Sequence, residues 1–210
     1  TPSGNRPAAG WQDGRMIYDS DRNRVLLLED SDLWEYNPVS YSWTEMFPTG
    51  MTDSYREDFG FAYDSHRKKA VVFAMEDEEE PPVMRIWEYD AISNSWEERI
   101  PVGEQPPLWM QMTMVYDKNA RKMVVFGGEH CFMEPTPICS NTNETWLWDG
   151  NSGTWERETF NSNVPVKRED HQMTYDTLSR RSYLIGGESE DTLGNFNDLW
   201  SFDTGSESYP

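Results

Sequence analysis

Aromatic residues recur along this chain in register, and this repeat limits the structures that the sequence can form more than any other feature. A Tyr-Asp pair comes first in each copy, a tryptophan follows it, and another aromatic residue lies nine positions after the tryptophan in every copy. Self-similarity of this kind indicates one structural unit repeated four times. The residues are Tyr18-Asp19, Tyr63-Asp64, Tyr116-Asp117 and Tyr175-Asp176; Trp34, Trp87, Trp146 and Trp200; and Trp43, Trp96, Trp155 and Tyr209.

Each copy is predicted to form four short strands. The first strand ends at Tyr-Asp, and a large apolar residue two positions earlier shares its face. The second strand follows a short basic turn, the third carries the tryptophan, and the fourth carries the last aromatic residue. An Asn or Asp three residues after the tryptophan is typical of a tight turn before the fourth strand. The apolar residues are Met16, Phe61, Met114 and Met173, and the turn residues are Asn37, Asp90, Asp149 and Asp203. Four-stranded units that repeat about every 50 residues predict an all-β propeller.

Composition excludes several classes of protein. The chain has 38 Asp and Glu against 18 Lys and Arg, and its net charge of −20 disfavours nucleic acids and anionic membranes as partners. The longest apolar runs, such as Val25–Leu28, are far shorter than the roughly 20 residues of a membrane-spanning helix. Ten Trp, ten Tyr and nine Phe supply apolar surface that disordered chains lack. We therefore expect a folded chain with no membrane span.

Taken together, these columns resemble the repeats of kelch-type β-propellers over roughly residues 10–209. In that family a double glycine closes the second strand, and Gly127-Gly128 and Gly186-Gly187 match it, whereas Glu29-Asp30 and Ala74-Met75 depart from it. The resemblance implies four antiparallel blades, at about residues 10–48, 56–100, 109–158 and 168–209, in one propeller domain or propeller section over residues 1–210.

Four blades are fewer than the five to seven with which kelch propellers usually close. The expectation is therefore a section of a longer propeller, because an exposed blade edge would otherwise invite pairing. An open arc completed by a second chain and a four-bladed ring are the alternatives. Further blades or self-assembly are accordingly expected.

The loops between the second and third strands are the candidate binding surface, because they are long and variable and share one face with the loops that join the blades. One of them holds the acidic run Glu76, Asp77, Glu78, Glu79 and Glu80. This run could bind a basic partner surface, or Ca²⁺, although its spacing does not match a calcium loop. The alternative is a solvated loop that aids solubility.

An Arg-Glu-Asp triplet occurs twice at equivalent positions, where the innermost strand of a blade begins. The two triplets are Arg56, Glu57, Asp58 and Arg168, Glu169, Asp170, and His171 follows the second. In the resemblance, Arg168 and His171 match an Arg and a His that many bacterial members carry there, and Arg56 matches the Arg alone. These side chains could hold a sugar, a carboxylate or an acidic peptide at the mouth of the central channel. Ion pairing between blades is the alternative.

Two cysteines, Cys131 and Cys139, lie in the long loop of the third copy. Their spacing suits a disulfide, which would imply an oxidising compartment and a secreted, periplasmic or cell-surface protein. Zinc binding with His130 and two free buried thiols are the alternatives, and the spacing is poor for zinc.

No catalytic motif is evident, and no cofactor is expected apart from the weak case for Ca²⁺. The resemblance implies contact with a protein or carbohydrate partner through loops on one face. We therefore expect a non-catalytic extracytoplasmic recognition module. A sugar-acting kelch-type enzyme and a structural subunit of a surface assembly are the alternatives, and fold analogy does not choose among them.

Overall fold

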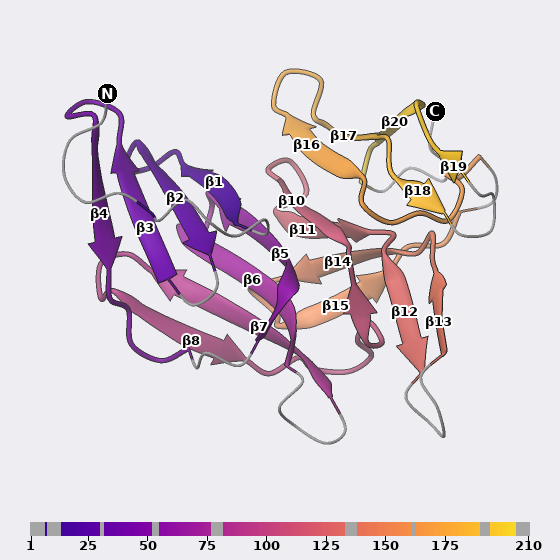
Figure 1. The fold of residues 1–210 in the computed structure, drawn as a ribbon, viewed down its shortest axis with the longest axis horizontal. Coiled ribbons are helices and arrows are strands. Elements are labelled where there is room, and N and C mark those ends of the chain that lie inside the picture. The colour runs from indigo at the N-terminus through magenta and orange to yellow at the C-terminus, as the bar shows by residue number, and fades with distance from the viewer. Residues whose placement is uncertain are drawn as a thin grey trace.

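The described residues form four antiparallel blades arranged in an arc, together with two small additional sheets, and they contain no helix (Figure 1). The predicted all-β class and its blade architecture are therefore confirmed. The computed structural model describes residues 7, 14–29, 32–51, 55–76, 82–132, 138–160, 163–189 and 194–204, with the backbone alone for 55–57 and 131–132.

Blades 1 and 2 each contain four strands that pair in chain order. Blade 1 consists of β1 (Arg15–Asp19), β2 (Arg24–Glu29), β3 (Asp32–Asn37) and β4 (Ser42–Met46). Blade 2 consists of β5 (Tyr55–Asp64), β6 (Lys69–Glu76), β7 (Val83–Asp90) and β8 (Ser95–Arg99). The predicted strand–turn–strand order holds throughout both blades.

Blades 3 and 4 follow the same order but carry additional short strands, one before the first strand of blade 3 and the others between the second and third strands of each blade. Blade 3 consists of β10 (Thr113–Asp117), β11 (Lys122–Phe126), β14 (Thr145–Asp149) and β15 (Thr154–Arg157). Blade 4 consists of β16 (Gln172–Asp176), β17 (Arg181–Ile185) and β20 (Leu199–Phe202). The additional strands are β9 (Trp109–Met110), β12 (Glu129–Phe132), β13 (Ile138–Asn141), β18 (Glu188–Ser189) and β19 (Gly194–Asn195). The fourth strand predicted at Tyr209 lies outside the described residues.

The predicted aromatic columns occupy equivalent places in the blades wherever their members are described. In each sheet the tryptophan of the third strand lies opposite an aliphatic residue of the second strand: Trp34 opposite Leu27, Trp87 opposite Val72, Trp146 opposite Val125, and Trp200 opposite Leu184. The aromatic residue two positions after this tryptophan forms a cross-strand ring pair with the aromatic residue of the fourth strand. The ring centroids are 5.0 to 5.4 Å apart in the pairs Tyr36 with Trp43, Tyr89 with Trp96, and Trp148 with Trp155. The sequence repeat is therefore a structural repeat.

The turn residues hold the hairpins through hydrogen bonds to their own backbone. The Asp64 carboxylate accepts from the amides of His66 and Arg67 at 2.9 and 3.0 Å, and Asp90 accepts from the amides two and three residues ahead of it. Such Asx turns were predicted for the third-to-fourth strand hairpins, and they also close the hairpins that follow Tyr-Asp. Equivalent bonds are made by Asp19, Asn37, Asp117, Asp149 and Asp176.

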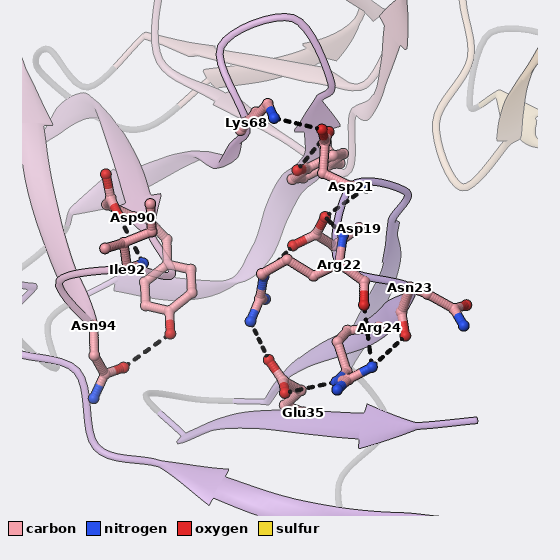
Figure 2. A network of polar contacts seen from close by, with 12 residues as sticks. Asp19, Asp21, Arg22, Asn23, Arg24, Glu35, Lys68, Asp90, Ile92 and Asn94 are labelled. Carbon is pink, nitrogen blue, oxygen red and sulfur yellow. Dashed lines mark hydrogen bonds and ion pairs between the residues drawn. The ribbon is translucent and has the colours of Figure 1, made fainter. Parts of the chain in front are cut away.

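Buried ion pairs tie the hairpins of the first two blades to their third strands. In Figure 2 the guanidinium of Arg22 lies between Asp19 and Glu35, with N···O distances of 2.6 Å to each. Arg67 makes the same pair of contacts in blade 2, and it also donates to the carbonyl oxygen of Gly150 in blade 3 at 3.0 Å. The basic residues of the turn thus neutralise carboxylates that the fold buries.

Consecutive blades pack through the same two surfaces each time. We call the side of a blade that carries its third-strand tryptophan the tryptophan face, and the other side the opposite face. The tryptophan face of blade 2 packs on the opposite face of blade 1, and the same arrangement joins blades 3 and 2 and blades 4 and 3. The opposite faces contribute aliphatic and aromatic residues such as Leu28, Phe73 and Phe126. Three interfaces of one kind therefore hold the arc together.

Candidate functional site

A cavity of about 550 Å³ lies among the innermost strands β1, β5, β10 and β16. This volume is within the usual range of ligand sites. Two predicted columns line it, namely the tyrosines of the Tyr-Asp pairs and the apolar residues two positions before them. These residues are Met16, Tyr18, Phe61, Tyr63, Met114, Tyr116, Met173 and Tyr175. The repeat thus gives the cavity an aromatic and sulfur-containing wall.

The wall of the cavity is far less acidic than the chain as a whole. Its charged side chains among the described residues are Arg15, Lys118 and Asp170, and the remaining polar groups are neutral amides, hydroxyls and the His171 imidazole. The arrangement can stack a ring or a methylene chain against the tyrosines and satisfy a few hydrogen bonds.

Arg168, a predicted ligand-binding residue, is fully buried and bound to blade 4. Its guanidinium donates to both carboxylate oxygens of Asp198 at 2.6 and 2.8 Å, to the carbonyl oxygens of Val166 and Gly186, and stacks on Phe196. These bonds from Arg168 lower the pKa of Asp198. The geometry describes a structural clamp within blade 4, which differs from the ion pairing between blades given as the alternative, and a ligand role for Arg168 stays a prediction.

The segment that contains Arg168 is held by the two double glycines. The amide of Gly128 donates to the carbonyl oxygen of Arg168 at 2.7 Å, and Glu169 exchanges two backbone hydrogen bonds with Glu188, which follows the second double glycine. All four glycines have positive φ, from 62° to 91°, so L side chains are disfavoured there. The family's double glycine thus positions the segment that ends at the cavity.

His171 lies at the end of that segment, and its imidazole is buried against the edge of the Phe126 ring, with 5.3 Å between the centroids. Neither ring nitrogen makes a hydrogen bond of good geometry. Burial, followed by the charge of Arg168, lowers the pKa of His171 to about 3, while the Phe126 backbone opposes part of this shift. The imidazole is therefore neutral in the folded protein at neutral pH.

His171 should make the stability of the protein depend on pH. An unfolded histidine titrates near pH 6.5, whereas folded His171 resists protonation down to about pH 3. The unfolded chain therefore binds the additional proton in this interval. Stability is full above about pH 6.5 and falls by up to about 1.4 kcal/mol per pH unit as the pH decreases toward 3.

The measurement is urea unfolding at several pH values for the native chain and for His171→Phe, which keeps a flat ring. The unfolding free energy of the variant should change less steeply with pH, and the difference in slope should correspond to the uptake of close to one proton. His66→Gln, at an exposed histidine in a turn, is the control variant. Identical slopes for the native chain and His171→Phe would contradict the expectation.

The other predicted site residues fall in different places. Asp170 lines the cavity together with His171, and Glu169 is buried beside Glu188. In blade 2, Asp58 is half-buried in β5, while the side chains of Arg56 and Glu57 lie outside the described residues. Of the five predicted residues whose side chains are described, two therefore line the cavity.

Only the first residue of the acidic run is described. Glu76 ends β6, and its carboxylate accepts a hydrogen bond from Arg85, which also binds Glu98. Asp77, Glu78, Glu79 and Glu80 lie outside the described residues. Within the described part of the chain, no cluster of three metal-ligating side chains occurs.

The segments between the second and third strands contain more paired strand than the sequence indicates. In blade 3, β12 and β13 form a hairpin that places Cys131 directly opposite Cys139, and β9 pairs with β12 on its other side. In blade 2, β6 and β7 continue as a paired ribbon to Glu76 and Val83. Figure 1 shows both hairpins projecting beyond the blades in the same direction.

Sequence reasoning missed Asp198, the partner of Arg168. Asp198 lies two residues before Trp200 and accepts a bond from the indole Nε1 at 2.6 Å, as Glu144 does for Trp146 at 2.8 Å. The repeated carboxylate two positions before the tryptophan was the available signal. It is absent in blade 2, where Arg85 occupies the position.

Comparison with known proteins defines the class to which this fold and cavity belong. Residues 60–209 match the KLHDC2/KLHL20/DRC7 Kelch-repeats domain, so the chain belongs to the kelch-repeat family. Kelch repeats generally mediate protein–protein interaction. No curated protein matches the chain. Among the described residues, none forms a helix long and apolar enough to cross a membrane.

Two solved structures share the fold. The one titled "Structure of YjhT" superimposes with a TM-score of 0.60 at 14% identity, over 85% of this chain and 51% of that one. A chain in "Cryo-EM structure of RAG in complex with one melted RSS and one unmelted RSS" gives 0.61 at 13% identity, over 95% and 67%. The chain therefore spans about half the length of the YjhT chain.

Proposed function

We propose that this chain is a non-catalytic recognition module that binds a protein partner through the hairpins β6–β7 and β12–β13. The observation that carries the proposal is that both hairpins extend past the blades as paired strands. The second of them is joined to the fold by β9, whose Trp109 is completely buried. A rigid scaffold that presents ordered projections is a common arrangement for binding.

A basic partner fits this surface best. The chain carries a net charge of −20, and the sequence between β6 and β7 contains four consecutive carboxylates, Asp77 to Glu80. The field of such a surface attracts cationic groups and is screened by salt. A partner rich in Lys or Arg would therefore bind faster and more tightly at low ionic strength.

An array of peptides of graded charge, probed in parallel with a glycan array, tests the proposal. Basic peptides should bind, and affinity should fall by tenfold or more between about 50 and 500 mM salt. Neutralising Glu78, Glu79 and Glu80 to Gln should weaken binding, whereas neutralising the exposed Glu97, Glu104 and Glu156 removes equal charge elsewhere and should not. Binding that ignores ionic strength, or equal losses in both triple variants, would refute the basic partner.

A carbohydrate ligand in the cavity is a second candidate. The observation that favours it is the wall of tyrosines from all four blades, interspersed with amides and hydroxyls. Aromatic faces with a few polar groups suit the stacking of a sugar ring. Glycan binding that Tyr175→Ala abolishes would support this ligand, and product formation from a simple sugar would instead support an enzyme.

We also propose that the chain is extracytoplasmic and carries a disulfide between Cys131 and Cys139. The support is their in-register position across a two-stranded ribbon, with Cys139 disulfide-bonded in the structure. Opposed residues of an antiparallel pair lie at a Cα separation that a disulfide spans. Mass measurement after alkylation without reductant should show no labelled thiol, and two labels would refute the bond.

A further inference from the structure

At the two ends of the arc, several residues are exposed whose equivalents inside it are buried, although Trp34 on the tryptophan face of blade 1 is only 7% exposed. Met16, on the tryptophan face of blade 1, is 66% exposed, whereas its equivalent Phe61 in blade 2 is 7% exposed. On the opposite face of blade 4, Ile185 is 53% exposed, whereas its equivalent Phe126 is completely buried. Tyr18 and Leu199, beside these residues, are also more than half exposed.

The polar contacts between blades are also incomplete at the ends. The hydroxyl of Tyr63 in blade 2 donates to Asp21, in the first turn of blade 1, at 3.1 Å. Likewise the hydroxyl of Tyr175 in blade 4 accepts from the backbone of Asn119, in the first turn of blade 3, at 3.2 Å. The equivalent Tyr18 of blade 1 instead donates to Asn23 in its own turn.

We propose that these two end faces bind each other between copies, so that the tryptophan face of blade 1 in one copy packs on the opposite face of blade 4 in a second copy. One chain carries both halves of this contact, and it makes the same contact three times internally.

The contact has a direction, because a tryptophan face packs on an opposite face and not on another tryptophan face. Such a heterologous contact makes a ring if the rotation closes and a filament if it does not. Two copies that each lack a different end can therefore still form one intact contact. The net charge of −20 opposes association, so added salt should strengthen it by screening.

The test is sedimentation velocity of the whole chain from about 1 to 200 μM at low and high salt. The native chain should associate, and more strongly at high salt. Met16→Glu with Tyr18→Glu at the blade 1 end, or Ile185→Glu with Leu199→Glu at the blade 4 end, should each weaken association more than tenfold. An equimolar mixture of these two double variants should form a dimer and nothing larger, which also shows that both variants are folded.

Control substitutions at exposed apolar residues outside the end faces distinguish this contact from nonspecific hydrophobic association. Ile92 and Leu178 are exposed residues of hairpin turns. The variants Ile92→Glu and Leu178→Glu should therefore associate as the native chain does. A native chain that stays monomeric at every concentration and salt would overturn the proposal. So would association that persists in either end variant alone, or a mixture that stays monomeric.

Discussion

Replacement of Arg67 by alanine should lower the free energy of unfolding by about 3–5 kcal/mol, because it removes the guanidinium that pairs with buried Asp64 and one of the two guanidinium groups that pair with buried Glu88, which keeps Arg99 at 3.2 Å. Arg67 lies between Asp64 and Glu88, with N···O distances of 2.7 Å to each, and both carboxylates are almost inaccessible to water. The same guanidinium also donates to Gly150 in the next blade, so the contact between blades 2 and 3 weakens as well.

The protein contains its own example of a compensated change. At the positions equivalent to Arg67 and Glu88, blade 3 has Ala120 and Leu147, and Leu147 is buried in the apolar cluster between blades 3 and 4. The double variant Arg67→Ala, Glu88→Leu should therefore be more stable than Arg67→Ala alone. Denaturant unfolding followed by tryptophan fluorescence measures both. A double variant less stable than the single one would contradict the expectation.

Substitution of Gly128 by alanine should cost about 3 kcal/mol or more. The residue has φ near +87°, and a Cβ there would lie 2.3 Å from the carbonyl oxygen of Met110 and 2.9 Å from the amide nitrogen of Met112. Both contacts are to backbone, which cannot rotate away. The substitution would also displace the segment at Arg168 that the Gly128 amide holds.

Gly103 is a matched control, because it has the same φ of +87° and no atom lies within 4 Å of the position that a Cβ would take there. Gly103→Ala should therefore cost only the left-handed strain, about 1–2 kcal/mol. Thermal unfolding of both variants measures the two losses of stability. Their difference gives the cost of the close backbone contact at Gly128, apart from the cost of the left-handed conformation. Equal costs would show that the packing around Gly128 relaxes freely.

The blade architecture could be predicted from the sequence because its signals are local and repeated. The aromatic pair Tyr89 and Trp96 forms across one tight hairpin, and the Asx turn at Asp90 between them depends on residues two and three positions away. Four copies of such a signal reinforce one another. Strand order and the shared face of the cavity-lining tyrosines follow from the period of two along each first strand.

The details of the candidate site could not be predicted in the same way. The bidentate pair of Arg168 and Asp198 joins residues that are thirty positions apart, and β9 pairs with β12 although all of blade 3's first hairpin lies between them. Each of these two contacts occurs once, and the repeated carboxylate two positions before the tryptophan does not identify Arg168 as the partner of Asp198. The small size of β12 and β13 also leaves too few residues for an alternating pattern to be visible.

Because the blades pack in a row, equivalent residues contribute differently to the free energy of unfolding in the central blades and in the outer ones. Phe73 and Phe126 are buried between neighbouring sheets, whereas Ile185, at the same register position of the last described sheet, remains half in water. Truncating the central residues removes apolar contact on both sides of an interface, and truncating Ile185 removes little. Local opening should consequently begin at the outer sheets and reach β6 and β11 last, as hydrogen exchange would reveal.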